Sequence, residues 1–133
     1  MAFRPTYGYT RTLAGTSYDQ AKEKVTEALK AEGFGVLTEI DVKATLKKKL
    51  DVDFRPYAIL GACNPPLAHK ALSSELPIGL LLPCNVVVTE DDGGNAVVSA
   101  VNPREMFKVV DNDELKAIAG EVDGRIQRVI EAL

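Results

Sequence analysis

The sequence of 133 residues contains no tryptophan, a single histidine and only two cysteines. Two cysteines are too few for the disulfide framework of a small secreted protein. The first nine residues lack the apolar run of a secretory signal, and no apolar stretch approaches the length of a membrane-spanning helix. We therefore expect a soluble, cytoplasmic protein with reduced thiols and no membrane partner.

A large excess of positive charge is also absent. The formal net charge of −3 argues against a dedicated nucleic-acid binder, because such proteins neutralise phosphates with a basic surface.

The charge is uneven: residues 1–70 hold 11 basic and 8 acidic side chains, whereas residues 71–133 hold 5 basic and 11 acidic ones. Such a separation favours antiparallel self-association, although exposed charge acts mainly on solvation and steering. We interpret Lys43 and the run Lys47–Lys49 as a solvated helix face rather than an anion site.

The pattern of apolar residues and turn signals predicts one domain over residues 1–133. The composition, 46% apolar and 26% charged, is that of a globular protein. We expect strands at residues 6–12, 34–40, 57–63, 85–90 and 96–101, and helices that begin near Ser17, Asp41, Pro65 and Asp111. This order implies an α+β fold, with a mostly antiparallel five-stranded sheet and helices packed on one face.

The final helix has the strongest signal. Asp111 and Glu114 have the spacing of a capping box, and apolar residues recur with a helical period from Leu115 to Leu133. Gly120 and Gly124 interrupt this helix at a cost of about 1 kcal/mol each relative to alanine. We therefore predict that these two glycines pack closely against another backbone.

The segment between Pro77 and Pro83, Ile-Gly-Leu-Leu-Leu, is too apolar for a free surface loop. Large exposed apolar patches on soluble proteins mark interaction sites. We predict that either the fold or a second subunit covers this segment.

Two Cys-Asn pairs and the only histidine stand at predicted strand ends. Cys63 and Asn64 end one strand, Cys84 and Asn85 begin another, and His69 follows in the helix between them. If the two strands are antiparallel neighbours, the end of the first adjoins the beginning of the second. We therefore predict that both thiols share one rim of the sheet.

This rim allows three interpretations. Cys63 precedes a helix N-terminus, where unpaired N–H groups lower a thiol pKa, so it is a candidate nucleophile or redox thiol with Cys84 as the resolving thiol. Alternatively, His69 with the cysteines, or with Met106, is a candidate set of metal or haem ligands. The structural interpretation is that both cysteines are small buried hydrophobic residues and His69 is a surface residue. No CxxC or HExxH motif supports the first two.

The segments at residues 57–65 and 80–88 resemble domain-of-unknown-function family 302 (DUF302), and the resemblance extends over nearly the whole chain. The signature residues of the family correspond to Gly61, Ala62, Cys63, Asn64, Pro65, Pro83, Cys84 and Asn85. The resemblance implies a small bacterial or archaeal α+β domain of a kind that forms homodimers. It implies no settled activity.

The leading hypothesis is a small-ligand-binding homodimer. We expect its site near Cys63, Asn64, His69, Cys84 and Asn85, with the apolar segment between the two prolines as a wall or a subunit contact. The alternatives are a thiol-dependent redox protein or enzyme, a metal or haem carrier, and an interaction module that presents an edge strand or a helix. The residues do not identify a cofactor or a reaction.

Overall fold

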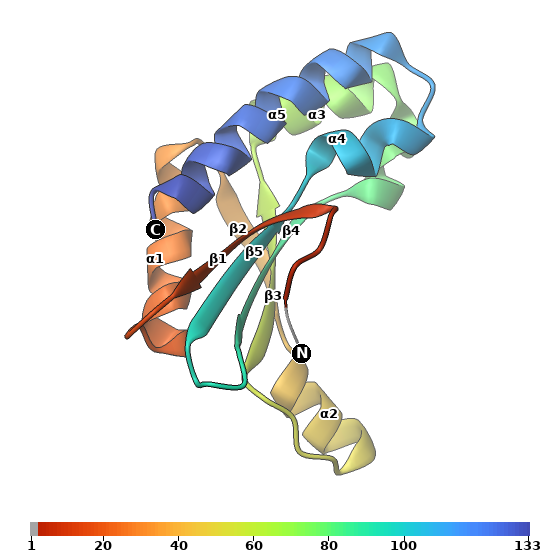
Figure 1. Ribbon diagram of the computed structural model, residues 1–133. Helices are drawn as coiled ribbons and strands as arrows, with labels where there is room; N and C mark the ends of the chain where they lie inside the picture. The colour runs from red at the N-terminus through yellow and green to blue at the C-terminus, as the bar shows by residue number, and fades with distance from the viewer. Residues whose placement is uncertain (1–2) are drawn as a thin grey trace.

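The structure, a computed structural model, describes residues 3–133. The elements, with the short 3-10 helices written η, are β1 (Gly8–Leu13), α1 (Tyr18–Ala31), β2 (Gly35–Asp41), α2 (Val42–Leu50), β3 (Tyr57–Cys63), α3 (Pro65–Ser74), η1 (Leu76–Leu81), β4 (Cys84–Glu90), β5 (Ala96–Val101), α4 (Pro103–Met106), η2 (Phe107–Val109) and α5 (Asp113–Glu131). The strands form one antiparallel sheet in the order β1-β5-β4-β3-β2 (Figure 1). The predicted α+β fold and five-stranded sheet are confirmed. Within residues 3–133, no helix has both the length and the apolar character needed to cross a membrane.

One face of the sheet carries the core. α1 and α5 lie side by side across this face (Figure 1). Alternate side chains of the central strands, including Leu60, Val86 and Val98, are almost completely buried in one cluster with Val25 of α1 and Ile126 of α5. The helices predicted on one face of the sheet lie on this one, where the alternate side chains of the strands form a continuous apolar layer with them.

The opposite face, which we call the open face, lies away from α1 and α5. It carries the other alternate residues of the strands, including the half-buried side chains of Ile59, Val87 and Val101 and that of Ile40, which is 49% exposed. A hollow of about 510 Å³ on this face is bordered by Val87, Val101 and Asn85, and by residues of the segment that leads into β1, among them Phe3 and Tyr7. The open face is therefore partly apolar, and part of it, including Val97 at 2% exposed, is already buried within the described chain.

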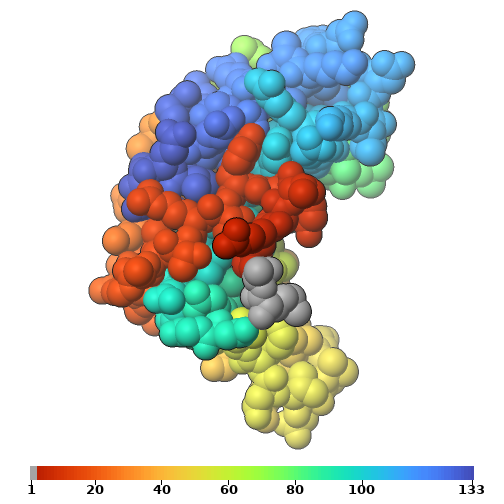
Figure 2. Space-filling model, viewed as in Figure 1, coloured from red at the N-terminus to blue at the C-terminus, as the bar shows by residue number. Residues whose placement is uncertain are grey.

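α2 projects from one end of the sheet (Figure 1). Asp41 ends β2 and caps α2, because its Oδ1 accepts a hydrogen bond from the N–H of Ala44 at 2.9 Å. The helix packs against the ends of β2 and β3. The structure describes every residue of α2, and none of them is buried. The helix extends the molecule, whose outline is hollowed on the side opposite α1 (Figure 2).

The helix caps follow the sequence with one shift. Ser17 and Gln20 exchange both hydrogen bonds of a capping box at 3.1 Å. The residue that caps α5 is Asn112 rather than the predicted Asp111, since Asn112 Oδ1 accepts from the N–H of Glu114 at 3.0 Å. Asparagine and aspartate are equally good N-caps, so the sequence did not separate the two neighbours.

The prediction for the two glycines of α5 is wrong. A Cβ at Gly120 would meet the guanidinium of Arg104 at 3.5 Å, and a Cβ at Gly124 would meet that of Arg128 at 3.6 Å. These are ordinary contacts with side chains. No close approach of another backbone requires a glycine at either position.

A buried carboxylate joins the first strand to the last helix. Asp123 of α5 is only 2% exposed. The Tyr9 hydroxyl donates to its Oδ1 at 2.6 Å, Gln127 Nε2 donates to its Oδ2 at 2.7 Å, and Arg104 Nε lies 3.4 Å from Oδ2. Burial of the phenol, followed by the hydrogen bond to Asp123, raises the pKa of Tyr9. These partners compensate the desolvation of the carboxylate, which would otherwise be costly.

We predict that Tyr9→Phe lowers the free energy of unfolding by about 2 kcal/mol, because a hydrogen bond to a charged, buried acceptor is lost. Urea denaturation measures the change. Tyr7→Phe is the matched control, since the Tyr7 side chain is 67% exposed; we expect a change within about 0.5 kcal/mol. Equal effects of the two substitutions would show that the network does not stabilise the fold.

Candidate functional site

A cleft of about 330 Å³ lies where β3 ends and β4 begins. Its walls come from β2, α3, η1 and the segment that leads into β4, and its floor comes from buried side chains of η2 and α5. The lining includes the apolar residues Phe34, Leu67, Leu72, Leu82, Phe107 and Ile118 and the polar or sulfur-bearing residues Thr38, Cys63, Asn64 and Cys84. None of the lining residues carries a charge. The volume lies within the range of small-molecule pockets, about 300–1,000 Å³.

Both cysteines line this cleft, at the edge of the sheet where β3 ends and β4 begins. β3 and β4 are antiparallel neighbours, and Ala62 lies opposite Cys84 in the register. Cys84 is 6% exposed on the core side of β4, whereas Cys63, the last residue of β3, is half-buried. The antiparallel pairing brings the end of β3 next to the start of β4, although twenty residues of sequence lie between the two cysteines. Strand alternation directs Cys63 to the other face of the sheet from Ala62 and Cys84, so the two cysteines line the cleft from the two sides of the sheet end.

Gly61 allows the wall of the cleft to form. A Cβ at this position would clash with Thr38 Oγ1 and would lie 2.8 Å from Cγ of Pro83. The register of β2 against β3 shifts between Val36 and Thr38, next to this contact. Thr38 and Pro83 both line the cleft, so they close over β3 where β3 has no side chain.

We predict that Gly61→Ala lowers the free energy of unfolding by about 1–3 kcal/mol, because an added methyl group must displace a strand or a proline ring. Thermal or urea denaturation measures the loss. Gly79→Ala is the control, since Gly79 also lines the cleft but an added Cβ there meets no atom within 4 Å. A destabilisation by Gly79→Ala as large as that by Gly61→Ala would contradict the steric explanation.

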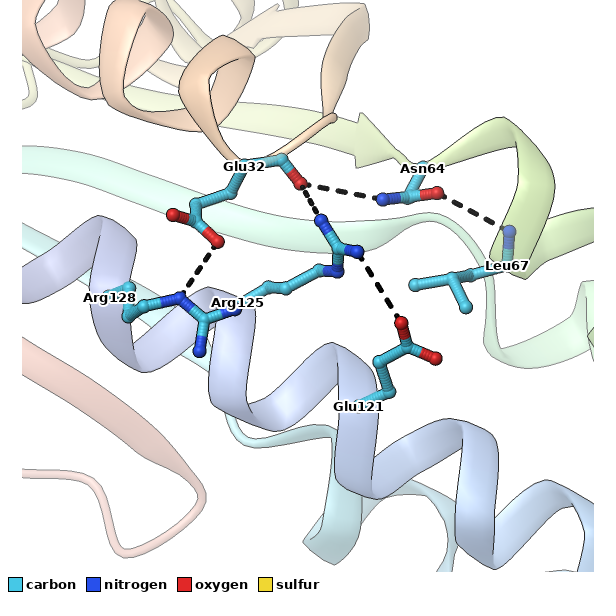
Figure 3. Close-up of polar contacts among 6 residues, drawn as sticks. All are labelled: Glu32, Asn64, Leu67, Glu121, Arg125 and Arg128. Carbon is cyan, nitrogen blue, oxygen red and sulfur yellow. Dashed lines mark hydrogen bonds and ion pairs between the residues drawn. The ribbon is translucent and has the colours of Figure 1, made fainter.

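Asn64 fixes the start of α3 at the edge of the cleft. It is 8% exposed, and its Oδ1 accepts a hydrogen bond from the N–H of Leu67 at 3.3 Å. Its Nδ2 donates to the main-chain carbonyl of Glu32 at 3.5 Å, and Arg125 Nη1 donates to the same carbonyl at 2.9 Å (Figure 3). The end of α1, the start of α3 and the middle of α5 are thus connected through one oxygen atom. A second link, from Arg128 Nε to Glu32 Oε1 at 2.9 Å, strengthens this connection.

The structure removes the physical basis for the predicted activation of Cys63. A helix N-terminus lowers a thiol pKa through N–H groups that have no partner. In α3 the first two residues are Pro65 and Pro66, which have no N–H, and the N–H of Leu67 is already bonded to Asn64. The first turn of α3 therefore offers Cys63 no free donor.

Cys84 is held as a protonated thiol. Burial, and to a smaller extent the proximity of Cys63, raises the pKa of Cys84 to about 11. The attacking species in thiol chemistry is the thiolate, which is rare at neutral pH for a thiol of this pKa. The redox interpretation, with Cys84 as the resolving thiol, is therefore not favoured by the geometry.

We predict that iodoacetamide modifies Cys63 well before Cys84 in the folded protein. With a pKa of about 11, only about one Cys84 thiol in a thousand is ionised at pH 8. Its modification should therefore rise with pH, by roughly tenfold per unit, until the pKa is reached. Peptide mass spectrometry after timed labelling measures both rates, and urea-unfolded protein, in which the two rates should converge, is the control. Faster labelling of Cys84 than of Cys63 at pH 8 would be incompatible with its burial.

Two of the five predicted site residues do not line the cleft. His69 is exposed on α3, and Asn85 faces the open side of the sheet because it follows Cys84 along β4. Met106, the candidate axial ligand, packs against the core. Within residues 3–133, no three side chains of the types His, Cys, Asp and Glu form a group able to hold a metal ion. The metal and haem interpretations therefore lack a ligand set in the described part of the chain.

Sequence reasoning missed most of the apolar lining. Phe34 precedes β2, and Ile118 and Val122 lie on α5, so residues far apart in sequence meet only in the folded chain. Each of them belongs to a pattern that indicates ordinary core packing. The one available signal was the apolar segment between Pro77 and Pro83, from which Leu82 lines the cleft.

The comparisons with known proteins agree on a family. A family model described as "Domain of unknown function DUF302" matches residues 9–133. The chain is similar to an uncharacterized conserved DUF302 protein from Bacillus stearothermophilus whose crystal structure is known. The identity is 31%, the TM-score is 0.88, and the match covers 96% of this chain and 98% of that chain. No curated protein matches the sequence.

Proposed function

This chain belongs to the DUF302 family, and we propose that it binds a small apolar molecule in the cleft and acts as a homodimer. The cleft carries the proposal. A pre-formed hollow of about 330 Å³, lined mainly by apolar side chains with a few polar groups at its rim, has the usual composition of a small-molecule site.

The lining selects the chemistry of the ligand. It contains no charged residue, so an ionised group taken into the cleft would lose its hydration without gaining a partner. The amide of Asn64 is already bonded at both ends. The expected ligand is therefore neutral and mostly hydrocarbon, and any polar group that it carries stays at the mouth, near Thr38 and Cys63.

The homodimer is supported by the apolar segment next to the cleft. The fold covers Ile78, which is 2% exposed, but it leaves Leu76 80% exposed and Leu80 88% exposed. One chain therefore covers only part of this segment. A second subunit would remove the remaining apolar surface from water.

The neutral fluorescent probe N-phenyl-1-naphthylamine tests the binding proposal. We predict saturable binding with one probe per chain. Ala68→Phe should weaken the binding by roughly tenfold or more, because the half-buried Ala68 lines the cleft and a phenyl ring there would occupy its volume. Fluorescence titration measures the dissociation constants.

Ser73→Phe is the matched control, since Ser73 is exposed on the same helix and does not line the cleft. Circular dichroism verifies that both variants fold. Absence of probe binding to the wild-type chain, or equal binding to both variants, would exclude the cleft as a site for apolar ligands.

A further inference from the structure

The hollow on the open face is separate from the cleft. Its volume is about 510 Å³. Among residues 3–133, none borders both the hollow and the cleft. Asn85, one of the five predicted site residues, does not line the cleft but borders this hollow. The proposed function therefore uses neither the hollow nor Asn85.

The segment of residues 3–7, which precedes β1, forms one wall of the hollow. The chain turns sharply between this segment and β1 (Figure 1). The N–H of Asn102 donates to the carbonyl of Tyr7 at 2.7 Å, which ties the turn to the end of β5. A Cβ at Gly8 would lie only 3.3 Å from Cγ of Pro5, so the segment packs closely on the start of β1. The wall is therefore held against the sheet by the fold.

The floor of the hollow is apolar. It is formed by Val87 of β4 and Val101 of β5, whose side chains are half-buried. The hydroxyl of Ser99 also borders the hollow, but it is already in a hydrogen bond of 2.8 Å with Thr10 Oγ1. The floor therefore favours contact with a hydrocarbon surface over contact with a polar group.

Aromatic side chains are concentrated around this floor. The sequence contains four phenylalanines, four tyrosines and no tryptophan, and three of these eight residues border the hollow: Phe3, Tyr7 and Tyr57. Aromatic side chains make specific stacked or edge-to-face contacts with other aromatic rings. Three of them around one hollow therefore favour a flat aromatic ligand over an alkyl chain.

The polar groups of the hollow favour an anion. Arg4 is the one charged residue that borders the hollow in the described part of the chain, and it has no ion-pair partner among residues 3–133. Burial, and to a smaller extent the proximity of Tyr7, raises the pKa of Tyr57, so its hydroxyl stays protonated at neutral pH and can donate a hydrogen bond. The exposed amide of Asn85 supplies a further donor. A guanidinium binds a carboxylate through two parallel hydrogen bonds.

We infer that this hollow is a second binding site, and that it takes a planar aromatic molecule with a single negative charge, such as an aromatic carboxylate. The apolar floor and the aromatic side chains hold the ring, and Arg4 and Asn85 bind the carboxylate. The site goes beyond the proposed function, because it differs from the cleft in all of its lining residues and in the charge of its ligand.

The probe is 2-naphthoate, and the uncharged 2-naphthamide, which has the same ring system, is its matched control. We expect the wild-type chain to bind one naphthoate with a dissociation constant below about 1 mM. The amide should bind at least about tenfold more weakly, because it lacks the charge-assisted hydrogen bonds to Arg4. Nuclear magnetic resonance titration of the full chain measures both constants, and a shift of the side-chain amide of Asn85 locates the ligand.

Substitution of Arg4 tests the charge. Arg4→Gln should raise the dissociation constant of naphthoate by about tenfold and leave that of naphthamide unchanged. Lys24→Gln is the matched control, since it removes one positive charge from an exposed position on α1 that does not border the hollow. Equal weakening by the two substitutions would show that net charge, and not a contact with Arg4, attracts the anion.

Filling the hollow tests its position. Val87→Phe should weaken the binding of both ligands by about tenfold or more, because the added ring occupies the floor. Ile59→Phe is the control, since Ile59 lies opposite Val87 in the register but does not border the hollow. Ala68→Phe, which fills the cleft, should leave naphthoate binding unchanged. Circular dichroism verifies the folding of every variant.

Three results would overturn the inference: no saturable binding of naphthoate up to about 1 mM, equal affinity for naphthoate and naphthamide, or loss of naphthoate binding through Ala68→Phe rather than Val87→Phe. The neutral probe N-phenyl-1-naphthylamine separates the two proposals. Naphthoate binding by a chain that does not bind this probe would support the hollow and exclude the cleft.

Discussion

The antiparallel pairing of β3 with β4 determines where the rim of the cleft lies. The pairing places Ala62 opposite Cys84, and it thereby sets the start of α3 next to the segment that leads into β4. The space between them is closed on the β2 side only because Gly61 has no side chain, so that Thr38 and Pro83 meet over β3. A different register would separate the cysteines and remove the wall, since a shift of one residue exchanges the two faces of a strand.

The same pairing also decides which chemistry the cleft supports. The two thiols come together in an apolar setting, where burial raises the pKa of Cys84 and two prolines deprive the first turn of α3 of free donors. The two cysteines therefore line the same cleft, but their surroundings do not stabilise a thiolate. The cleft has instead the properties of a hydrocarbon-binding surface, with a rigid edge at Asn64, where one carbonyl connects three helices.

Much of the fold could be predicted from the sequence because its signals are local. Valine-rich strands around an acidic glycine turn specify the β4–β5 hairpin, and the Ser17 capping box marks the start of α1.

The candidate site was harder to predict. The expectation that the two cysteines lie near each other followed from one assumption, that their strands are antiparallel neighbours. The position of Asn85 did not, although strand alternation places it on the other face from Cys84. The apolar lining from Phe34 and Ile118 could not be predicted, because it depends on how α1 and α5 pack on the sheet, and nothing local encodes that packing.

The position of β1 has a consequence for synthesis of the protein on the ribosome. β1 is an edge strand whose only strand partner in the sheet is β5, and its Tyr9 is held by Asp123 near the end of the chain. Domains form during translation as their segments emerge. β1 therefore leaves the exit tunnel well before β5 and stays unpaired until β5 has followed it. During that interval its exposed backbone is a surface that a chaperone can occupy or another nascent chain can join.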